Sequence, residues 1–242
     1  MIQEEHTRTA MLIGTAALER LRGARVAVFG VGGVGSYLCE ALARAGVGEL
    51  DLFDNDVVSL SNINRQLIAL HSTVGKAKVD VMRDRILDIN PECRVTAHRV
   101  FYLPENADLY PLDGYDYIAD AIDTVTAKLE LAVRARAAGV PIISAMGTGN
   151  KLDPTRLCVT DVSKTEGCPL ARVMRRELKA RGMTHMKVVF SSEPIVPRPS
   201  DVPTPPQDCR RTPPASISFV PSVAGLMMAG EIVRDLIANA TE

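Results

Sequence analysis

The feature that most constrains the fold is a glycine loop between a short apolar run and a helical segment. Residues 25–29 are rich in Val and Phe, residues 30–35 read Gly-Val-Gly-Gly-Val-Gly, and residues 37–45 have helical spacing. A strand, a glycine-rich turn and a helix in this order form the first unit of a Rossmann-type fold. Glycine lets the backbone approach a phosphate, and the helix start offers N–H groups that bind anions. The predicted nucleotide-binding glycines are Gly30, Gly32, Gly33 and Gly35.

The rest of the chain alternates in the same way and predicts an α/β fold. Strands are predicted near residues 25–29, 49–53, 94–98, 115–119 and 141–145. This alternation favours a Rossmann-like, mainly parallel sheet with helices on both faces. A C-terminal α/β segment extends the fold, with strands predicted near 156–160 and 186–190 and helices near 169–180 and 222–237.

Asp54 is compatible with two kinds of nucleotide. It follows the second predicted strand at the distance from the glycines at which an acid binds a ribose hydroxyl. Gly30, Gly32 and Gly35 also satisfy the dinucleotide fingerprint G-x-G-x-x-G, so the first 56 residues fit NAD as well as ATP. A purely structural glycine turn is a third interpretation, which the surrounding strand, helix and acid disfavour.

Two cations further along the chain favour ATP. Arg65 can hold phosphate oxygens with a bidentate guanidinium, and Lys78 supplies a compact positive charge. Nucleotidyl transfer needs such cations because negative charge builds on the α-phosphate and the leaving pyrophosphate, whereas hydride transfer does not. Either residue alone would usually be a solvated surface charge. Their joint occurrence after the glycine loop and Asp54 indicates a triphosphate site.

Two acids follow the strand predicted at 115–119. Asp120 and Asp123 would lie at the C-terminal edge of a parallel sheet, where carboxylates can bind Mg²⁺ and ribose. The alternative is that one of them caps the helix predicted at 125–138, and Asp123 is a suitable N-cap residue. Both interpretations stay open at this point, and Asp120, which we include among the ATP-binding residues, is the weaker candidate of the two.

Together these residues resemble the nucleotide motif of the ubiquitin-activating-enzyme-like superfamily of ATP-dependent adenylating proteins. The matching positions, in order and spacing over about residues 18–150, are Gly30 to Gly35, Asp54, Ser61-Asn62, Arg65-Gln66, Lys78 and Asp123. The resemblance implies that Asp54 binds ribose and that Asn62, Arg65 and Lys78 hold the phosphates, with Gln66 in the ATP-binding set. It also implies that Arg65, Lys78 and the Mg²⁺ ligand Asp123 form the catalytic group.

The C-terminal half is similar to one branch, the tRNA threonylcarbamoyladenosine dehydratases. The supporting segments are residues 145–154, 160–165, 168–171 and 216–221. The resemblance implies ATP-dependent activation of the threonyl carboxylate of threonylcarbamoyladenosine in tRNA, followed by cyclodehydration. Cys168 stands where this branch more often carries an acid, so we do not assume that it is catalytic. A nucleophile within the same modified base would close the ring, so no protein nucleophile is needed.

Three rival functions remain open. An adenylyltransferase for a ubiquitin-like sulfur carrier would use the same ATP site. That branch usually carries two C-x-x-C zinc pairs, but no two of the five cysteines here are three apart, so no zinc is expected. An NAD-dependent oxidoreductase would leave Arg65, Lys78 and Asp123 unexplained. A non-catalytic scaffold that recruits a cysteine-desulfurase or sulfur-acceptor system is the third, and an intact nucleotide motif weighs against it.

The chain divides into three segments of one compact unit. Residues 1–22 form a leading helix with Met11 and Leu18 on its apolar face, residues 23–150 form the ATP-binding Rossmann-like domain, and residues 151–242 form the C-terminal segment. Eight prolines between residues 194 and 214 exclude a regular helix or a central strand. We expect a crossover loop there, before the final helix.

Charge and composition suggest the partners. The net charge of the 242-residue chain is −1, but residues 163–211 hold ten Lys or Arg against five Asp or Glu. A local basic region suits an enzyme that handles tRNA, although it also fits a solvated helix face. The candidate tRNA-binding residues are Arg172, Arg175, Arg176, Lys179, Arg210 and Arg211.

Compartment and assembly are expectations of the same kind. Scattered cysteines and the lack of a visible signal peptide favour the cytoplasm. The apolar run 219–230 is too short to cross a bilayer, so no integral membrane insertion is expected. The superfamily usually forms homodimers, which we expect here. Whether a monovalent cation is required besides ATP and Mg²⁺ stays open.

Overall fold

The computed structural model describes residues 3–201 and 214–238 and has a single seven-stranded sheet. Its strands are β1 Arg25–Phe29, β2 Glu49–Phe53, β3 Arg94–His98, β4 Tyr117–Asp120, β5 Ile142–Ala145, β6 Leu157–Asp161 and β7 Lys187–Ser191. Their order is β3-β2-β1-β4-β5-β7-β6, and all neighbours are parallel except β6 and β7. The predicted fold class, a Rossmann-like and mainly parallel sheet, is confirmed.

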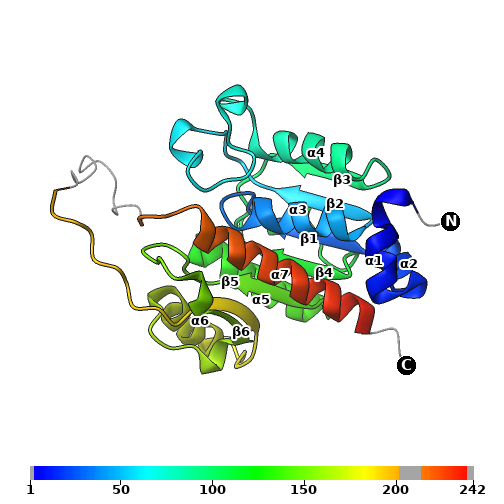
Figure 1. The fold of residues 1–242 in the computed structure, drawn as a ribbon. Helices are drawn as coiled ribbons and strands as arrows, with labels where there is room; N and C mark the ends of the chain where they lie inside the picture. The colour runs from blue at the N-terminus through cyan, green and yellow to red at the C-terminus, as the bar shows by residue number, and fades with distance from the viewer. Residues whose placement is uncertain (1–2, 202–213, 239–242) are drawn as a thin grey trace.

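Helices connect these strands and cover the sheet (Figure 1). The α-helices are α1 Thr7–Ile13, α2 Thr15–Gly23, α3 Gly35–Ala45, α4 Lys78–Ile89, α5 Val125–Ala138, α6 Pro169–Ala180 and α7 Phe219–Ala238. The 3₁₀-helices are η1 Glu4–His6, η2 Leu60–Asn62, η3 His71–Thr73, η4 Ala107–Leu109, η5 Pro154–Arg156 and η6 Val162–Lys164.

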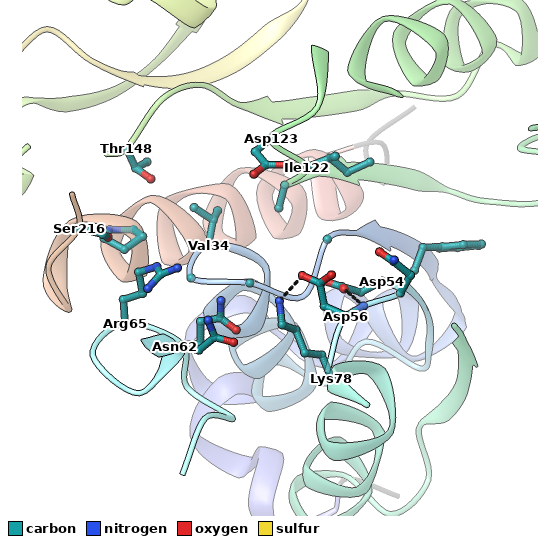
Figure 2. Close-up of a pocket in the computed structure, with 18 of the residues that line it drawn as sticks. Val34, Asp54, Asp56, Asn62, Arg65, Lys78, Ile122, Asp123, Thr148 and Ser216 are labelled. Carbon is teal, nitrogen blue, oxygen red and sulfur yellow. Dashed lines mark hydrogen bonds and ion pairs between the residues drawn. The ribbon is translucent and has the colours of Figure 1, made fainter. Parts of the chain in front are cut away.

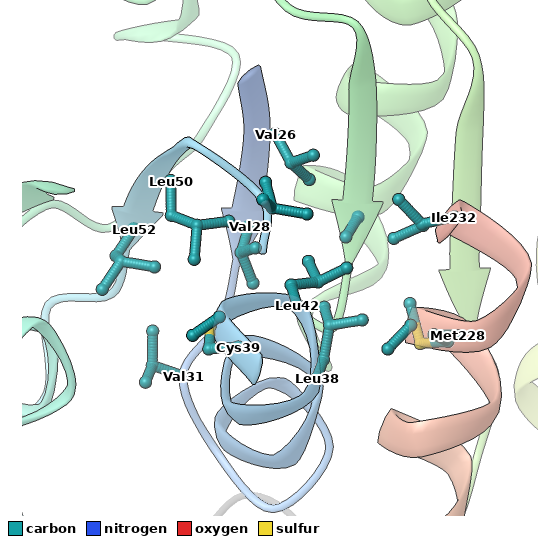
Figure 3. Packing of buried hydrophobic residues seen from close by; sticks show 14 of the residues in the cluster. Val26, Val28, Val31, Leu38, Cys39, Leu42, Leu50, Leu52, Met228 and Ile232 are labelled. Atoms are coloured by element: carbon teal, nitrogen blue, oxygen red, sulfur yellow. The ribbon is translucent and has the colours of Figure 1, made fainter. Parts of the chain in front are cut away.

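The central strands β1, β4, β5 and β7 are almost fully buried, as is usual for parallel strands that helices cover on both faces, whereas the edge strands β3 and β6 are partly exposed. Helices α3, α4 and α7 pack on one face, and Figure 3 shows Leu38 and Leu42 of α3 between the strands and Met228 of α7. Helix α5 packs on the other face against residues such as Phe29, and α6 packs beside it against β7.

Helices α3 and α7 approach each other closely, and this approach helps to build the functional end of the molecule. A Cβ atom on Gly225 of α7 would lie 2.2 Å from the carbonyl oxygen of Val34, so only glycine allows this packing. The start of α7 is thereby held against the glycine loop. Residues more than 180 positions apart thus meet at the carboxyl ends of the strands.

The leading segment differs from the single helix that was predicted. Gly14, with φ 84° and ψ 163°, separates α1 from α2, because a residue with these angles cannot continue a right-handed helix. Leu18 is fully buried, but Met11 is 83% exposed and Leu12 is 85% exposed. Met11 therefore does not share a packed face with Leu18 within this chain.

Most other element boundaries follow the prediction. Strand β4 begins at Tyr117 rather than at residue 115, because the Asp116 carboxylate accepts a hydrogen bond from the backbone N–H of Arg25 just before the strand. Helix α7 begins at Phe219, before the predicted start at 222, with Pro221 in its first turn, where proline is tolerated.

The C-terminal segment joins the same sheet, since β7 pairs with β5 and β6 pairs with β7. The division of the chain into three segments stays an interpretation. Of the proline-rich stretch, residues 194–201 and Pro214 form neither helix nor strand, and residues 202–213 lie outside the described part. Among the described helices, none is both long enough and apolar enough to cross a membrane.

Candidate active site

A pocket of about 540 Å³ opens at the carboxyl ends of the central strands (Figure 2). The strand order reverses between β1 and β4, and ligand sites of open α/β sheets form at such switch points. The pocket brings together most of the predicted site residues, namely Gly30, Gly32, Gly33, Asp54, Asn62, Arg65, Gln66, Lys78 and Asp123.

Glycine is needed at these loop positions for two different structural reasons. Gly30 has φ 90°, and a Cβ atom there would lie 2.7 Å from the carbonyl oxygen of Ala121. A Cβ on Gly35 would lie 1.7 Å from the carbonyl oxygen of Gly30, so the tight turn of the loop requires glycine at this position. Gly35 itself does not line the pocket. Gly32 and Gly33 line the pocket at the start of α3, where backbone N–H groups can receive an anion.

Asp54 is held rigidly at the end of β2. Its carboxylate accepts hydrogen bonds of 2.8 Å from the backbone N–H groups of Val31 and Asp56. Burial raises the pKa of the Asp54 carboxyl, although the charge of Lys78 and the two N–H donors oppose this effect. The fixed carboxylate ties the glycine loop to β2 and lies at the wall of the pocket.

Lys78 is a buried cation at the first residue of α4. Its Nζ lies 2.7 Å from a carboxylate oxygen of Asp56, and the lysine is only 5% exposed. A bridge between Val57 and Ala77 and the hydrogen bond from the Lys78 N–H to the Asp56 carbonyl hold the two segments together. The ammonium is therefore placed at the pocket by backbone pairing.

Arg65 follows the short helix η2 and extends towards the pocket (Figure 2). Its Nη1 donates to the Ser61 carbonyl and to the Asn64 side chain, each at 2.9 Å. In the described part of the chain no carboxylate pairs with it. Asn62 uses its Oδ1 to accept from the Ser59 N–H, and the buried Oε1 of Gln66 has no protein partner.

Asp120 is placed differently from the expectation. It is fully buried and does not line the pocket. Its carboxylate receives the Lys128 ammonium at 2.9 Å, the Ser144 hydroxyl at 2.5 Å and the Ile122 N–H at 3.1 Å. Lys128 also donates to the carbonyls of Ile122 and Ala145. Asp120 and Lys128 thus form a buried ion pair beneath the pocket, and Asp120 is corrected from a ligand to a support.

This pair supports the short loop that carries Asp123. Asp123 lines the pocket on the side opposite Lys78 (Figure 2). Thr124, not Asp123, occupies the N-cap position of α5, so the capping interpretation of Asp123 is wrong. Within residues 3–201 and 214–238 no cation pairs with Asp123, and no three His, Cys, Asp or Glu side chains gather into a metal cage.

Sequence reasoning missed the apolar end of the pocket. Phe53, Val100, Phe101 and Tyr102 line it beside Asp54. Tyr102 meets Phe29 edge to face at 4.9 Å, and burial raises the pKa of Tyr102 to about 12. The aromatic pair directly after β3 was the available signal, but nothing in the sequence indicates that it folds back over β2.

The far wall was also missed. Thr148 and Gly149 follow β5, and Pro214, Ser216 and Pro221 come from the start of α7 and the segment before it. A Gly-Thr-Gly sequence after a strand was the only local signal. The remaining residues are brought to the pocket by the approach of α7 to α3.

The candidate tRNA-binding residues are only partly free. Arg172 and Lys179 are exposed on α6, whereas Arg175 donates to the backbone and hydroxyl of Thr165 and Arg176 pairs with Glu177. Arg210 and Arg211 lie outside the described residues. Near these arginines, Cys168 is buried as the N-cap of α6, where its Sγ accepts from the Ala171 N–H at 3.5 Å.

Comparison with known proteins decides the family, since the ThiF family description matches residues 6–242. The chain belongs to the ThiF family. The predicted membership of the ubiquitin-activating-enzyme-like superfamily is therefore confirmed. Among relatives, the tRNA threonylcarbamoyladenosine dehydratase of Bacillus subtilis strain 168 is 47% identical over 242 residues, covering 97% of this chain and 95% of that protein.

Solved structures of this ThiF branch agree. Crystal structures of Escherichia coli tRNA N6-threonylcarbamoyladenosine dehydratase in complex with ATP and with AMP align with a TM-score of 0.88 at 36% identity, covering 99% of this chain and 98% of theirs. The molybdopterin-synthase adenylyltransferase of Escherichia coli K12 is 40% identical over 127 residues, only 52% of this chain and 50% of that protein. The similarity to the Bacillus dehydratase therefore extends over nearly the whole chain, whereas the similarity to that adenylyltransferase covers about half of it.

Proposed function

We propose that this chain uses ATP to activate the threonyl carboxylate of threonylcarbamoyladenosine in tRNA and to cyclise the modified base with loss of water. The observation that carries this proposal is the end-to-end similarity to a dehydratase, including the C-terminal half. The pocket supplies the groups that ATP requires, on one continuous surface.

In this proposal ATP lies in the pocket with its adenine at the apolar end. Phe53, Val100 and Phe101 offer an apolar surface for adenine beside Asp54, whose fixed carboxylate suits a ribose hydroxyl. The phosphates then lie over Gly32 and Gly33 at the start of α3, between Lys78 and Arg65. Asn62 and Gln66 also line the pocket there and offer further polar contacts.

The charges of the pocket call for a divalent cation. Its lining includes two cations, Arg65 and Lys78, against the carboxylates of Asp54, Asp56 and Asp123. Bound triphosphate adds several negative charges, which this set does not neutralise. Mg²⁺ usually combines one or two carboxylates with phosphate oxygens, so the unpaired Asp123 fits as its protein ligand. Bound there, Mg²⁺ would neutralise phosphate charge.

The chemistry follows from making a carboxylate a better electrophile. A threonyl carboxylate oxygen bonds to the α-phosphorus, and the bond to pyrophosphate breaks with its electron pair leaving on pyrophosphate. Arg65 and Lys78 stabilise the charge that builds during transfer. A nucleophile in the same base then attacks the activated carbonyl and expels AMP, which needs no protein nucleophile. Attack on the γ-phosphate, giving ADP, is the alternative route to the same product.

Finer features belong to this proposal. The exposed Arg172 and Lys179 of α6, with Arg176, are the described candidates for phosphate contacts with tRNA. We also propose a homodimer, for which the exposed Met11 and Leu12 offer apolar surface. We propose a cytoplasmic location, which is consistent with a tRNA substrate. A cysteine-desulfurase system remains a candidate partner, and a monovalent cation a candidate requirement.

The test is incubation of the protein with ATP, Mg²⁺ and tRNA that carries threonylcarbamoyladenosine, followed by nucleoside mass spectrometry. We expect the modified nucleoside to lose one water only when ATP is present. Arg65→Ala should slow this reaction about 10²-fold or more. An unchanged nucleoside, with pyrophosphate exchange only when a ubiquitin-like carrier protein is added, would assign the chain to the sulfur-carrier branch instead.

A further inference from the structure

The far wall of the pocket is built by a side-chain clamp. Asn150 has φ 56° and is the only non-glycine residue with positive φ in the described ranges, a conformation that Asn tolerates better than most residues. Its backbone N–H donates to the Ala215 carbonyl, and its Oδ1 accepts from the Ala215 N–H, both at 2.8 Å. Its carbonyl accepts from the Val196 N–H at 2.9 Å. One residue therefore fixes both the segment that enters and the segment that leaves the proline-rich stretch.

The clamp places two hydroxyl-bearing residues at the same end of the pocket. Thr148 precedes Asn150 by two residues, and Ser216 follows the clamped Ala215. Gly149 allows the contact between the two segments, because a Cβ there would lie 2.6 Å from the Cβ of Pro214. Figure 2 shows Thr148 and Ser216 at the end of the pocket near Arg65, away from Asp54.

A second side chain joins this wall to the phosphate side. The Nδ2 of Asn64 donates to the Ser216 carbonyl at 3.1 Å, and its Oδ1 accepts from Nη1 of Arg65 at 2.9 Å. Arg65 and Ser216 are thus linked through one amide. The part of the wall formed by Thr148, Gly149, Pro214 and Ser216 contains no acid, so it would not repel an anionic group brought beside the phosphates.

We propose that Thr148 and Ser216 form the acceptor subsite, which holds the threonyl carboxylate and its neighbouring hydroxyl next to the α-phosphate, with Asn150 as the positioning residue. The inference rests on the proposed function and deepens it. Adenosine occupies the apolar end beside Asp54 and the phosphates reach Arg65, so the acceptor must enter from the remaining side. The two hydroxyls and the guanidinium of Arg65 are the donors present there, and hydroxyl donors and arginine match a carboxylate beside an alcohol.

Hydroxyl removal tests the subsite. Thr148→Val and Ser216→Ala are compared with the wild type and with Thr184→Val, which changes an exposed threonine outside the pocket. We expect each pocket variant to lower kcat/KM for the modified tRNA about 10- to 100-fold, the usual effect of losing a hydrogen bond to a charged group. The Kd for ATP should stay within about 2-fold of the wild type, since the nucleotide contacts are retained. Thr184→Val should leave both quantities unchanged.

Asn150 is tested by a variant that separates positioning from folding. Asn150→Gly tolerates the positive φ of this position but loses the side-chain acceptor for the Ala215 N–H. We expect Asn150→Gly to raise KM for the modified tRNA while the Kd for ATP is unchanged. A merely structural residue would lower the Tm and weaken ATP binding together.

The outcomes distinguish failure of the acceptor-subsite proposal from failure of the proposed function. An active wild type whose Thr148→Val and Ser216→Ala variants keep full kcat/KM would overturn the acceptor subsite alone. Loss of ATP affinity in parallel with activity would also overturn it, because the residues would then serve the nucleotide. A wild type that does not dehydrate the modified tRNA would overturn both the proposed function and this subsite.

Discussion

The ammonium of Lys78 lies 2.7 Å from the carboxylate of Asp56, and the two side chains differ sharply in exposure. The Lys78 side chain is 6% exposed, whereas that of Asp56 is 60% exposed. The cation is therefore buried at the pocket, with a partner that water can solvate if the pair is broken. In the proposed function, ATP phosphate takes the place of Asp56 beside Lys78.

Lys78→Met should separate catalysis from stability. The substitution keeps the length and burial of the side chain but removes the charge that stabilises the transferring phosphate. We expect kcat/KM for the modified tRNA to fall about 10²-fold or more, with the Tm little changed because Asp56 remains hydrated. Lys76→Met, at an exposed position two residues earlier, is the matched control and should behave as the wild type. Near-normal turnover by Lys78→Met would contradict the assignment of the phosphate site.

Asp123→Asn should change the dependence on Mg²⁺. If Asp123 is the protein ligand, losing its charge weakens the metal–ATP complex in the site. We expect the Mg²⁺ concentration at half-maximal activity to rise about 10-fold, the lower end for disturbing a metal site. Asp113→Asn, in an exposed turn, serves as the control. An unchanged Mg²⁺ titration at full activity would exclude Asp123 as the ligand.

The buried ion pair of Lys128 and Asp120 should contribute strongly to the free energy of unfolding. Lys128→Met leaves the carboxylate of Asp120 fully buried with no opposite charge. Breaking such a pair costs about 3–5 kcal/mol in the free energy of unfolding. Urea denaturation measures this, and Lys164→Met at an exposed site should change the value by less than about 0.5 kcal/mol. If both variants lose the same small amount, Lys128 does not support the loop.

A pH effect should appear where α3 meets α4. Glu40 is partly buried, which opposes ionisation, but hydrogen bonds from Arg85 and Arg44 hold the pKa of its carboxyl below the ordinary value. A lowered folded-state pKa contributes stability above the unfolded pKa, about 4.3, that is lost as the pH falls through the folded pKa. Glu40→Gln should therefore unfold at lower urea concentration than the wild type at pH 7.

Repeating the comparison of wild type and Glu40→Gln at acidic pH tests whether the stability difference depends on the charge of Glu40. As the pH falls below the unfolded pKa and then through the lowered folded pKa, the wild type loses the stability that the Glu40 carboxylate contributes, so the two midpoints should approach each other. Glu92→Gln, at an exposed residue, should show no such convergence because it starts with no difference. A Glu40→Gln deficit that stays constant between pH 7 and pH 3 would mean that shape, not charge, matters there.

The sequence predicted what is local and missed what is long-range. The glycine loop, Asp54 and Lys78 could be placed because each follows a strand or opens a helix whose pattern is readable. Asp120 could not be separated from Asp123, because the difference is set by Lys128, which turns back from α5 onto Asp120, and by Ser144 on the next strand. On α6, the number of basic side chains free to bind tRNA is likewise smaller than the sequence suggests. Contacts such as that of Arg175 with Thr165 cannot be predicted from residue spacing.

The far wall of the pocket was hardest to predict for the same reason. Asn150 and Ala215 are 65 positions apart, and Asn64 and Ser216 are 152 apart, yet hydrogen bonds join both pairs. These hydrogen bonds, together with the packing of α7 on α3, hold Ser216 at the pocket. Such contacts depend on the complete sheet, so composition and periodicity do not contain them.

The most direct test of carboxylate activation follows the oxygen atom. The protein is given ATP, Mg²⁺ and tRNA whose threonylcarbamoyladenosine carries ¹⁸O in both carboxylate oxygens, and single-turnover products are weighed by mass spectrometry. The account predicts that each ring closure leaves one ¹⁸O in the cyclic product and transfers the other to AMP, or to inorganic phosphate if the γ-phosphate is attacked. Recovery of the departed ¹⁸O in water, with unlabelled AMP and phosphate, would contradict the account.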